Sequence, residues 1–239
     1  MKSLTIIKVG STFPAIKQRF GDFEDWIVKT GQLSAQAVSV FDITATELLP
    51  SVDSLSGVII TGSHAMVTDQ NYRMQKLAAW LPQLVQRQIP LLGICFGHQL
   101  LAQAMGGQVG YHPDGREIGT VNIALTAEGK QDALFKSLPG TFTAHATHAQ
   151  TVLTLPESAA LLAQNSFEAH HAYRIGDRAW GVQFHPEFSA DIMQAYIDEQ
   201  ADSLHHEGRD ITLLEKATCD TDKANTLISR FIAIAQSDH

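Results

Sequence analysis

Two kinds of hydrophobic pattern alternate along the first half of the chain, one typical of buried strands and one of amphipathic helices. Short apolar runs predict strands at 4–9, 37–41, 58–61 and 90–94. Apolar residues at helical spacing predict helices at 23–30, after Asp69 and at 97–105. This alternation is typical of a parallel sheet with helices on its faces.

The helix predicted after Asp69 carries a proline within its apolar face. Leu77, Leu81 and Leu84 recur at the spacing of one helix face, and Asp69 is placed to cap the start of the helix. Pro82 lacks an N–H, so it should either kink this helix or restart it.

The second half of the chain has a different hydrophobic pattern, because its apolar runs are short, close together and separated by turns. They predict an antiparallel extension of the sheet, with strands at 108–111, 119–125, 141–146, 159–164, 169–175 and 179–184. Two helices should follow, one from Ser189 to about Leu204 and a last one capped by Asp210 or Thr212. The apolar face of the last helix is formed by Leu227, Ile228, Phe231 and Ile234.

These patterns predict an α/β fold with a mostly parallel central sheet, flanking helices and a small antiparallel extension. No linker or repeat interrupts the 239 residues, so a single domain over 1–239 is expected. The net charge of −8 argues against nucleic acid as a partner. The chain has no apolar run of about 18 to 20 residues and no signal-peptide pattern, so no membrane partner and a cytoplasmic location are expected.

The chain has only two cysteines, and one of them lies where a predicted strand meets a predicted helix. Cys95 stands between Gly93 and Gly97, the cysteine version of a nucleophile elbow. In such a sharp turn, side chains two positions before and after the nucleophile would collide. The turn places the sulfur at a helix N-terminus, which favours the thiolate, and points the Phe96 N–H at a substrate oxyanion.

Most free cysteines are structural, and for a lone cysteine that interpretation is favoured. The two glycines and the strand–turn–helix setting favour a nucleophile for Cys95. Cys219 lies in a predicted polar helix without such a setting, and we assign it no role.

A cysteine nucleophile needs a base, and His185 has the best setting among the 11 histidines. It follows a predicted strand, and Glu187 should point the same way because strand side chains alternate. A carboxylate beside an imidazole fixes its tautomer. The alternative is a surface histidine beside a surface glutamate, which the pair in isolation would favour.

The segments G-I-C-F-G-H-Q at 93–99 and Q-F-H-P-E at 183–187 together resemble the class I glutamine amidotransferases. The resemblance covers roughly residues 55–190, and within the family the chain looks most like the amidotransferase part of GMP synthetase and its free-standing relatives. It implies a flavodoxin-like fold and hydrolysis of the γ-amide of glutamine through a cysteine thioester, giving glutamate and ammonia.

The resemblance also implies roles for individual residues. Cys95 corresponds to the nucleophile, His185 to the general base and acid, and Glu187 to the residue that orients the histidine. Gln99 corresponds to a contact of the substrate glutamine. The loop with Gly62 and Ser63 corresponds to the source of the second oxyanion donor; its Ser63 and His64 depart from the usual Gly-Gly-Pro.

A second segment resembles the part of the family that helps to hold the substrate. Thr147 and His148 align with the loop that helps to bind glutamine, and Gln150 stands where an aspartate is usual. An amide cannot form an ion pair with an ammonium group as a carboxylate does. The contact with the substrate α-amino group, or a contact with a partner, should therefore differ from that in the family. The implied chemistry needs no metal or organic cofactor, and the remaining histidines lack the ligand spacing of a zinc site.

Three hypotheses remain at this stage. The chain is a glutaminase subunit that feeds ammonia to a separate synthetase subunit, a free-standing hydrolase of γ-glutamyl amides or peptides, or a non-enzymatic module on the same fold. Intact Cys95, His185 and Glu187 argue against the third. No nucleotide-binding glycine motif is present and the residues after His185 are too few for a synthetase domain, so the acceptor chemistry is expected elsewhere or not at all. The chain ends soon after the expected fold is complete, which weakly favours a self-sufficient hydrolase.

Overall fold

The computed structural model describes residues 2–34, 36–46, 48–69 and 71–237. Its elements, in chain order, are β1 (Ser3–Lys8), α1 (Pro14–Phe20), α2 (Phe23–Thr30), β2 (Val38–Asp42), the 3₁₀ turn η1 (Val52–Ser54), β3 (Leu55–Ile60), α3 (Tyr72–Gln86), β4 (Leu91–Ile94), α4 (Phe96–Ala104), β5 (Gln108–Tyr111), β6 (Glu117–Leu125), β7 (Thr141–His148), β8 (Gln150–Thr154), β9 (Ala159–Gln164), β10 (Ala172–Ile175), β11 (Ala179–Val182), α5 (Ala190–Glu199), α6 (Ala201–His206), α7 (Ile211–Ala217) and α8 (Asp222–Gln236).

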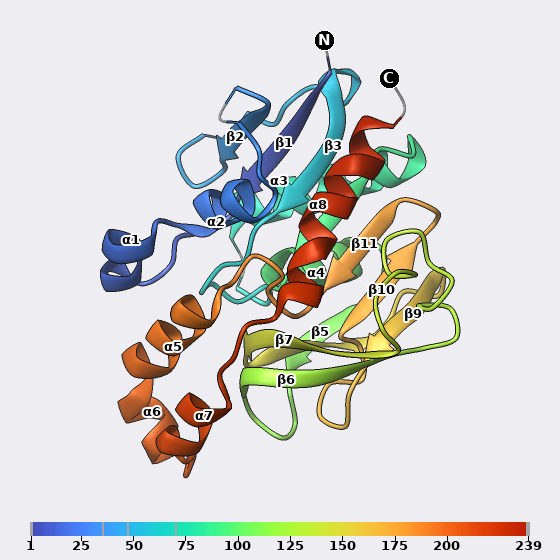
Figure 1. Ribbon diagram of the computed structural model, residues 1–239. Coiled ribbons are helices and arrows are strands. Elements are labelled where there is room, and N and C mark those ends of the chain that lie inside the picture. The colour runs from blue at the N-terminus through green and yellow to red at the C-terminus, as the bar shows by residue number, and fades with distance from the viewer. Residues whose placement is uncertain (1, 35, 47, 70, 238–239) are drawn as a thin grey trace.

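A nine-stranded sheet runs through the molecule in the order β2-β1-β3-β4-β11-β10-β9-β6-β7 (Figure 1). The strands β2, β1, β3, β4 and β11 pair in parallel, and we call them the parallel half. From β11 to β7 every pair is antiparallel, and we call β10, β9, β6 and β7 the antiparallel half. The strands β5 and β8 form a separate antiparallel pair. The predicted α/β fold, with its mostly parallel sheet and antiparallel extension, is confirmed.

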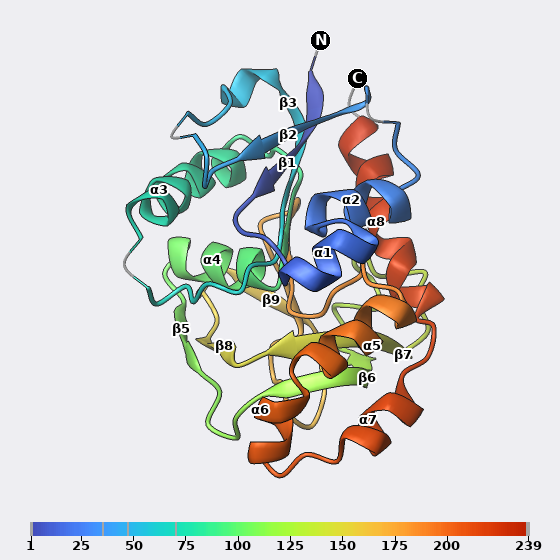
Figure 2. The same cartoon turned by 90° about the vertical axis from the view of Figure 1, so that its left-hand side faces the viewer.

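Helices cover both faces of the parallel half (Figure 2). On one face lie α3 and α4, and on the other lie α2 and α8. This explains why every residue of β3 is buried, since a strand covered on both sides reads as a continuous apolar run. In α8 the predicted face is buried at Leu227, Ile228 and Phe231.

The helix α3 differs from the prediction at its start and at its proline. Its N-cap is Asn71, whose side chain accepts a hydrogen bond from Arg73 N at 2.9 Å. Asp69 instead accepts from Met66 N in the preceding loop. Pro82 lies inside an uninterrupted helix, so the predicted restart is wrong. A single proline removes one backbone hydrogen bond, which the buried apolar face of α3 compensates.

One α-helix and one strand were not predicted, and neither was the 3₁₀ turn η1. The short helix α1 buries only Ile16, so it has no apolar periodicity to recognise, although Pro14 stands at its first turn. The strand β8 occupies residues interpreted above as a substrate-binding loop, and it pairs with β5 outside the main sheet. The strand predicted at 169–175 begins only at Ala172.

Four helices follow the last strand rather than the two predicted. The first prediction divides at Gln200, whose side-chain Nε2 donates to Tyr196 O, into α5 and α6. The second divides into α7, capped by Asp210 and not by Thr212, and α8. Cys219 therefore lies in the connection between two helices and not within one. None of the helices in the described ranges is long and apolar enough to span a bilayer.

Candidate active site

The turn between β4 and α4 has the strained geometry that the sequence predicts. Cys95 is the residue at this turn and has φ 49° and ψ −97°, in the region that side chains rarely adopt. A Cβ added at Gly93 would lie 2.4 Å from the Gly97 carbonyl oxygen, and one added at Gly97 would lie 2.8 Å from Ile60 O. Glycine is thus required at both positions, because the opposing atoms belong to the backbone.

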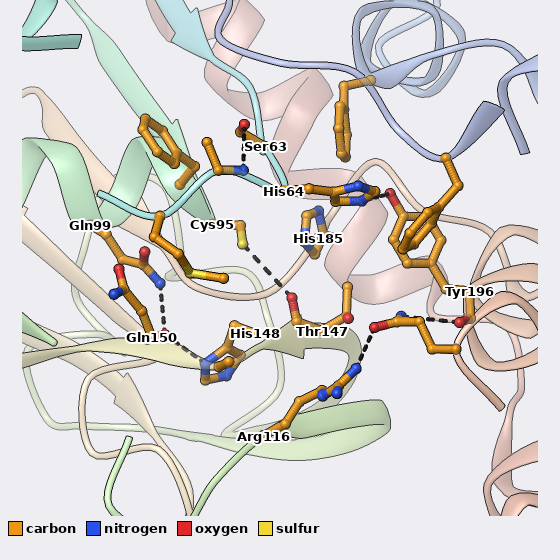
Figure 3. A pocket seen from close by; sticks show the side chains of 17 residues that line it. Ser63, His64, Cys95, Gln99, Arg116, Thr147, His148, Gln150, His185 and Tyr196 are labelled. Atoms are coloured by element: carbon orange, nitrogen blue, oxygen red, sulfur yellow. Dashed lines mark hydrogen bonds between the residues drawn. The ribbon is translucent and has the colours of Figure 1, made fainter. Parts of the chain in front are cut away.

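Three chain segments meet where strands of the parallel half end. The loop after β3 carries Gly62 and Ser63, the elbow after β4 carries Cys95, and the segment after β11 carries His185 (Figure 3). Cys95 N donates to Val182 O, the last residue of β11, at 2.8 Å, which ties the elbow to the histidine segment. Ligand sites of open parallel sheets form at this carboxyl edge.

The ring of His185 is fixed on several sides. Its Nδ1 lies 2.8 Å from Glu187 Oε1, and its backbone N donates to His145 O at 2.8 Å. Phe188 stacks on the ring with centroids 4.1 Å apart. The strand ends at Val182, and a turn closed by Phe188 N donating to His185 O brings Glu187 to the ring. The predicted pairing is present, but the predicted strand alternation is not its cause.

The electrostatics of this corner keep a proton on His185. Burial lowers the pKa of His185, but the charges of Glu187 and Cys95 outweigh it and raise the pKa to about 10. Burial, and then the charge of His185, lower the pKa of the neighbouring His145 to about 4. Burial also lowers the pKa of His64, with a smaller contribution from His185. The surroundings thus favour the charged form of His185 and the neutral forms of His145 and His64.

On the other side of Cys95, amide groups are arranged by hydrogen bonds. Gln99 Nε2 donates to Gln150 O at 2.7 Å and to Gln183 Oε1 at 2.9 Å. This leaves the Gln99 side-chain oxygen available to a ligand. Cys95 Sγ itself lies 3.9 Å from Thr147 O. The backbone of 147–150 is therefore tied to both the nucleophile and Gln99.

A buried network that sequence reasoning missed lies behind this backbone. His148 Nδ1 lies 3.0 Å from Gln150 O, and its Nε2 lies 3.0 Å from Glu117 Oε2. Glu117 Oε2 also lies 3.2 Å from His171 Nε2, and Asn165 donates to its Oε1. Burial opposes ionisation of Glu117, but hydrogen bonds from His148 and His171 hold its pKa well below the ordinary value.

A cavity of about 300 Å³ opens above Cys95. Of the predicted site residues, seven line it: Ser63, Cys95, Phe96, Gln99, Thr147, His148 and His185. Gly62 lies against the ring of His185, and Glu187 is buried behind it. Phe96 opens α4, where a helix has no internal partner for its first N–H groups.

The cavity is also lined by residues that no sequence motif indicated, among them Arg116, Tyr196 and Gln200. Tyr196 OH lies 2.7 Å from Thr12 Oγ1 and 3.2 Å from His64 Nε2. These side chains come from segments remote from the two motifs, so only the fold brings them together. Across the described ranges, no three His, Cys, Asp or Glu side chains are grouped to hold a metal ion.

Comparisons with known proteins show the family and the fold of the chain. The family model for glutamine amidotransferase class I matches residues 20–201. The chain is 34% identical to gamma-glutamyl peptidase 4 of Arabidopsis thaliana over 62% of this chain and 59% of that protein. It is 33% identical to the glutamine-hydrolyzing GMP synthase of Porphyromonas gingivalis over 68% of this chain and 32% of the synthase. The chain thus spans less than two thirds of each of these relatives.

The fold also matches a solved structure over its whole length. A glutamine amidotransferase from Thermotoga maritima superposes with a TM-score of 0.78, covering 99% of this chain and 100% of the other, at 20% identity. At that identity the likeness concerns the fold.

Proposed function

This chain belongs to the class I glutamine amidotransferase family, and we propose that it hydrolyses the γ-amide of glutamine through a thioester on Cys95, giving glutamate and ammonia. The observation that carries the proposal is the strained elbow: Cys95 has φ 49° at the head of a helix, beside a histidine held by a carboxylate. Strain of this kind is retained where exposing a side chain serves chemistry.

In the first step, the Cys95 sulfur attacks the γ-carbonyl carbon and a tetrahedral oxyanion forms. The Phe96 N–H and an N–H of the Gly62–Ser63 loop are the donors available to this oxygen. Each such donor is typically worth about 10² to 10³ in rate.

His185 serves both halves of the reaction. As an imidazolium it gives its proton to the departing nitrogen, which leaves as ammonia and breaks the C–N bond. The neutral ring then removes a proton from water, which attacks the thioester and releases glutamate. Glu187 fixes the tautomer and steadies the cation.

The glutamyl group binds on the side of Gln99, Thr147 and His148. The free side-chain oxygen of Gln99 and the carbonyl of Thr147 are acceptors for an α-ammonium group. The ammonia passes either to solvent or to a separate synthetase subunit.

A second candidate function is hydrolysis of γ-glutamyl amides or peptides by the same residues. The cavity favours it, because its lining includes Tyr196, Gln200 and Arg116 in addition to the residues proposed to bind the glutamyl group. Ammonia needs none of that space, whereas a larger leaving amine does.

The proposal is tested by assaying the purified chain with glutamine, γ-glutamyl amines and γ-glutamyl peptides. Cys95→Ala and Cys95→Ser should abolish hydrolysis of every one while the circular dichroism spectrum stays unchanged. Full activity of Cys95→Ala would refute the mechanism. Strong glutaminase activity without a partner would support glutamine hydrolysis as the function. Preference for a γ-glutamyl peptide would support the second candidate function.

A further inference from the structure

The loop that follows β3 is held to the rest of the fold at few points. We call residues 62–66 the oxyanion loop, after the role given to it in the proposed function, on which this inference rests. Ser63 Oγ accepts from Ala65 N at 3.1 Å, a bond inside the loop. Among the described residues, the one hydrogen bond from the loop to a residue distant in the chain joins His64 Nε2 to Tyr196 OH at 3.2 Å.

The backbone of the oxyanion loop leaves donors for a ligand. Within the described ranges, the N–H groups of Gly62, Ser63 and His64 bond to no atom of the protein. Such donors stabilise an oxyanion well only when they are fixed before the reaction, because donors that must first move cost reorganisation energy. Whatever fixes the loop should therefore affect the chemical step.

The loop lacks the residue that would restrict its backbone from within. His64 stands where the resembled family has proline, which fixes φ near −65°, whereas histidine does not. The His64 ring supplies contacts instead. It extends from the loop toward Tyr196, and the ring of Phe13 lies against it with centroids 4.1 Å apart (Figure 3). A side chain thus provides the restriction that a proline ring would provide.

Tyr196 is itself firmly placed. It lies in α5 and is 1% exposed, and its OH lies 2.7 Å from Thr12 Oγ1. Thr12 N in turn donates to Asp22 Oδ1, at the N-cap of α2, at 2.9 Å. Burial raises the pKa of Tyr196, so the hydroxyl keeps its hydrogen and can donate one bond while accepting another. The hydroxyl therefore connects a buried part of the fold to His64.

We propose that Tyr196 is a positioning residue: through His64 it holds the oxyanion loop where the N–H groups of Gly62 and Ser63 meet the oxyanion. Those N–H groups act on the tetrahedral intermediate more than on the bound substrate. Loss of the Tyr196 hydroxyl should therefore lower kcat and change KM little.

A different role is open to the same hydroxyl, because Tyr196 also lines the cavity. If it contacted the substrate directly, its effect would not depend on His64 and would include KM. The two roles are separated by testing whether Tyr196 and His64 act as one unit.

The test is a double-mutant cycle of Tyr196→Phe and His64→Phe in the purified full chain, assayed with glutamine and with a γ-glutamyl peptide. Both substitutions keep an aromatic ring and remove one partner of the hydrogen bond. Each single variant should lower kcat about tenfold and change KM less than about threefold. The double variant should fall no further than either single variant, since the bond can be lost only once.

Tyr173→Phe is the matched control. It also removes a buried hydroxyl, but one in β10 that donates to His98 O at 2.6 Å and makes no contact with the oxyanion loop. Whatever its own effect on kcat, that effect should multiply with the effect of His64→Phe.

His64→Pro tests the same inference by rescue, because it restricts the loop covalently. In the His64→Pro chain, Tyr196→Phe should lower kcat less than about twofold. A tenfold fall in this background as well would overturn the inference. The cycle of phenylalanine variants decides the question if the His64→Pro chain fails to fold.

The outcomes distinguish this inference from the proposed function. Hydrolysis by the wild type that depends on Cys95, with kcat unaffected by Tyr196→Phe, would overturn the inference and leave the proposed function standing. Multiplicative effects of Tyr196→Phe and His64→Phe, or a rise in KM with kcat unchanged, would do the same. Absence of hydrolysis of either substrate by the wild type would overturn both.

Discussion

In the parallel half of the sheet, Cys95 and His185 follow the strands β4 and β11, and backbone geometry places them. Cys95 has a positive φ, and its N–H bonds to the end of the neighbouring strand. In the antiparallel half, His148 is held instead by side chains: Glu117 binds it, and His171 and Asn165 bind Glu117. The site residues of the parallel half are positioned by steric fit, and those of the antiparallel half by buried hydrogen bonds.

This difference predicts that the two halves fail in different ways. A steric clash in the parallel half changes the fold, because a backbone atom cannot move aside. A substitution that removes a hydrogen-bond acceptor in the antiparallel half should leave the fold intact and disturb the substrate side of the cavity. Substitutions in each half can distinguish these two kinds of failure.

Gly93→Ala should cost about 3 kcal/mol or more of unfolding free energy, because the new methyl group would meet the Gly97 backbone. Urea unfolding measures this. Gly140→Ala is the matched control, since its Cβ would find its nearest atom 3.5 Å away on a lysine side chain. Equal stability of the two variants would show that the elbow is not sterically closed.

Glu117→Gln should cost about 2 kcal/mol, because it removes the charge from the acceptor shared by His148 and His171. It should also raise KM for the preferred substrate about tenfold, the equivalent of 1.4 kcal/mol, with a smaller change in kcat. Steady-state kinetics separate the two parameters. Exposed Glu128→Gln is the control, and a loss confined to kcat would contradict a role on the substrate side.

The two halves should lose stability at opposite ends of the pH scale. The pKa of His185 is raised from 6.5 to about 10, so its contribution is complete below 6.5 and is lost as pH rises toward 10. The loss is about 1.4 kcal/mol per pH unit within that window. The pKa of Glu117 is lowered, so its contribution is present above 4.5 and is lost as pH falls.

This pH dependence is measured by urea unfolding of the wild type against His185→Gln between pH 7 and 10, and against Glu117→Gln below pH 5. The difference from His185→Gln should shrink with rising pH and the difference from Glu117→Gln with falling pH. Parallel curves would contradict the assigned pKa directions.

The smallest effect is expected at the second cysteine. Cys219 is exposed in the connection between α7 and α8, remote from the cavity lining. Cys219→Ser should leave kcat/KM unchanged and the unfolding free energy within about 0.5 kcal/mol of the wild type. A large loss of activity would give this residue a role that its position does not explain.

The contrast also explains what could be predicted from the sequence. A sharp elbow restricts residue types at fixed spacing, so Gly93, Cys95 and Gly97 signal it locally. The network of Glu117 and the contact of Arg116 with Gln200, 84 positions away in the chain, leave no local pattern. The break between α7 and α8 was missed for a related reason: Thr218–Thr221 contains neither glycine nor proline, and Thr221 makes no side-chain cap.

If Cys95 forms the acyl intermediate, its sulfur should be trapped by an electrophilic analogue of glutamine. The purified chain is treated with a diazo-ketone analogue of glutamine, and the modified residue is located by mass spectrometry of peptides. We expect one label per chain on Cys95, and none in Cys95→Ala. A label on Cys219, with Cys95 unmodified, would contradict it.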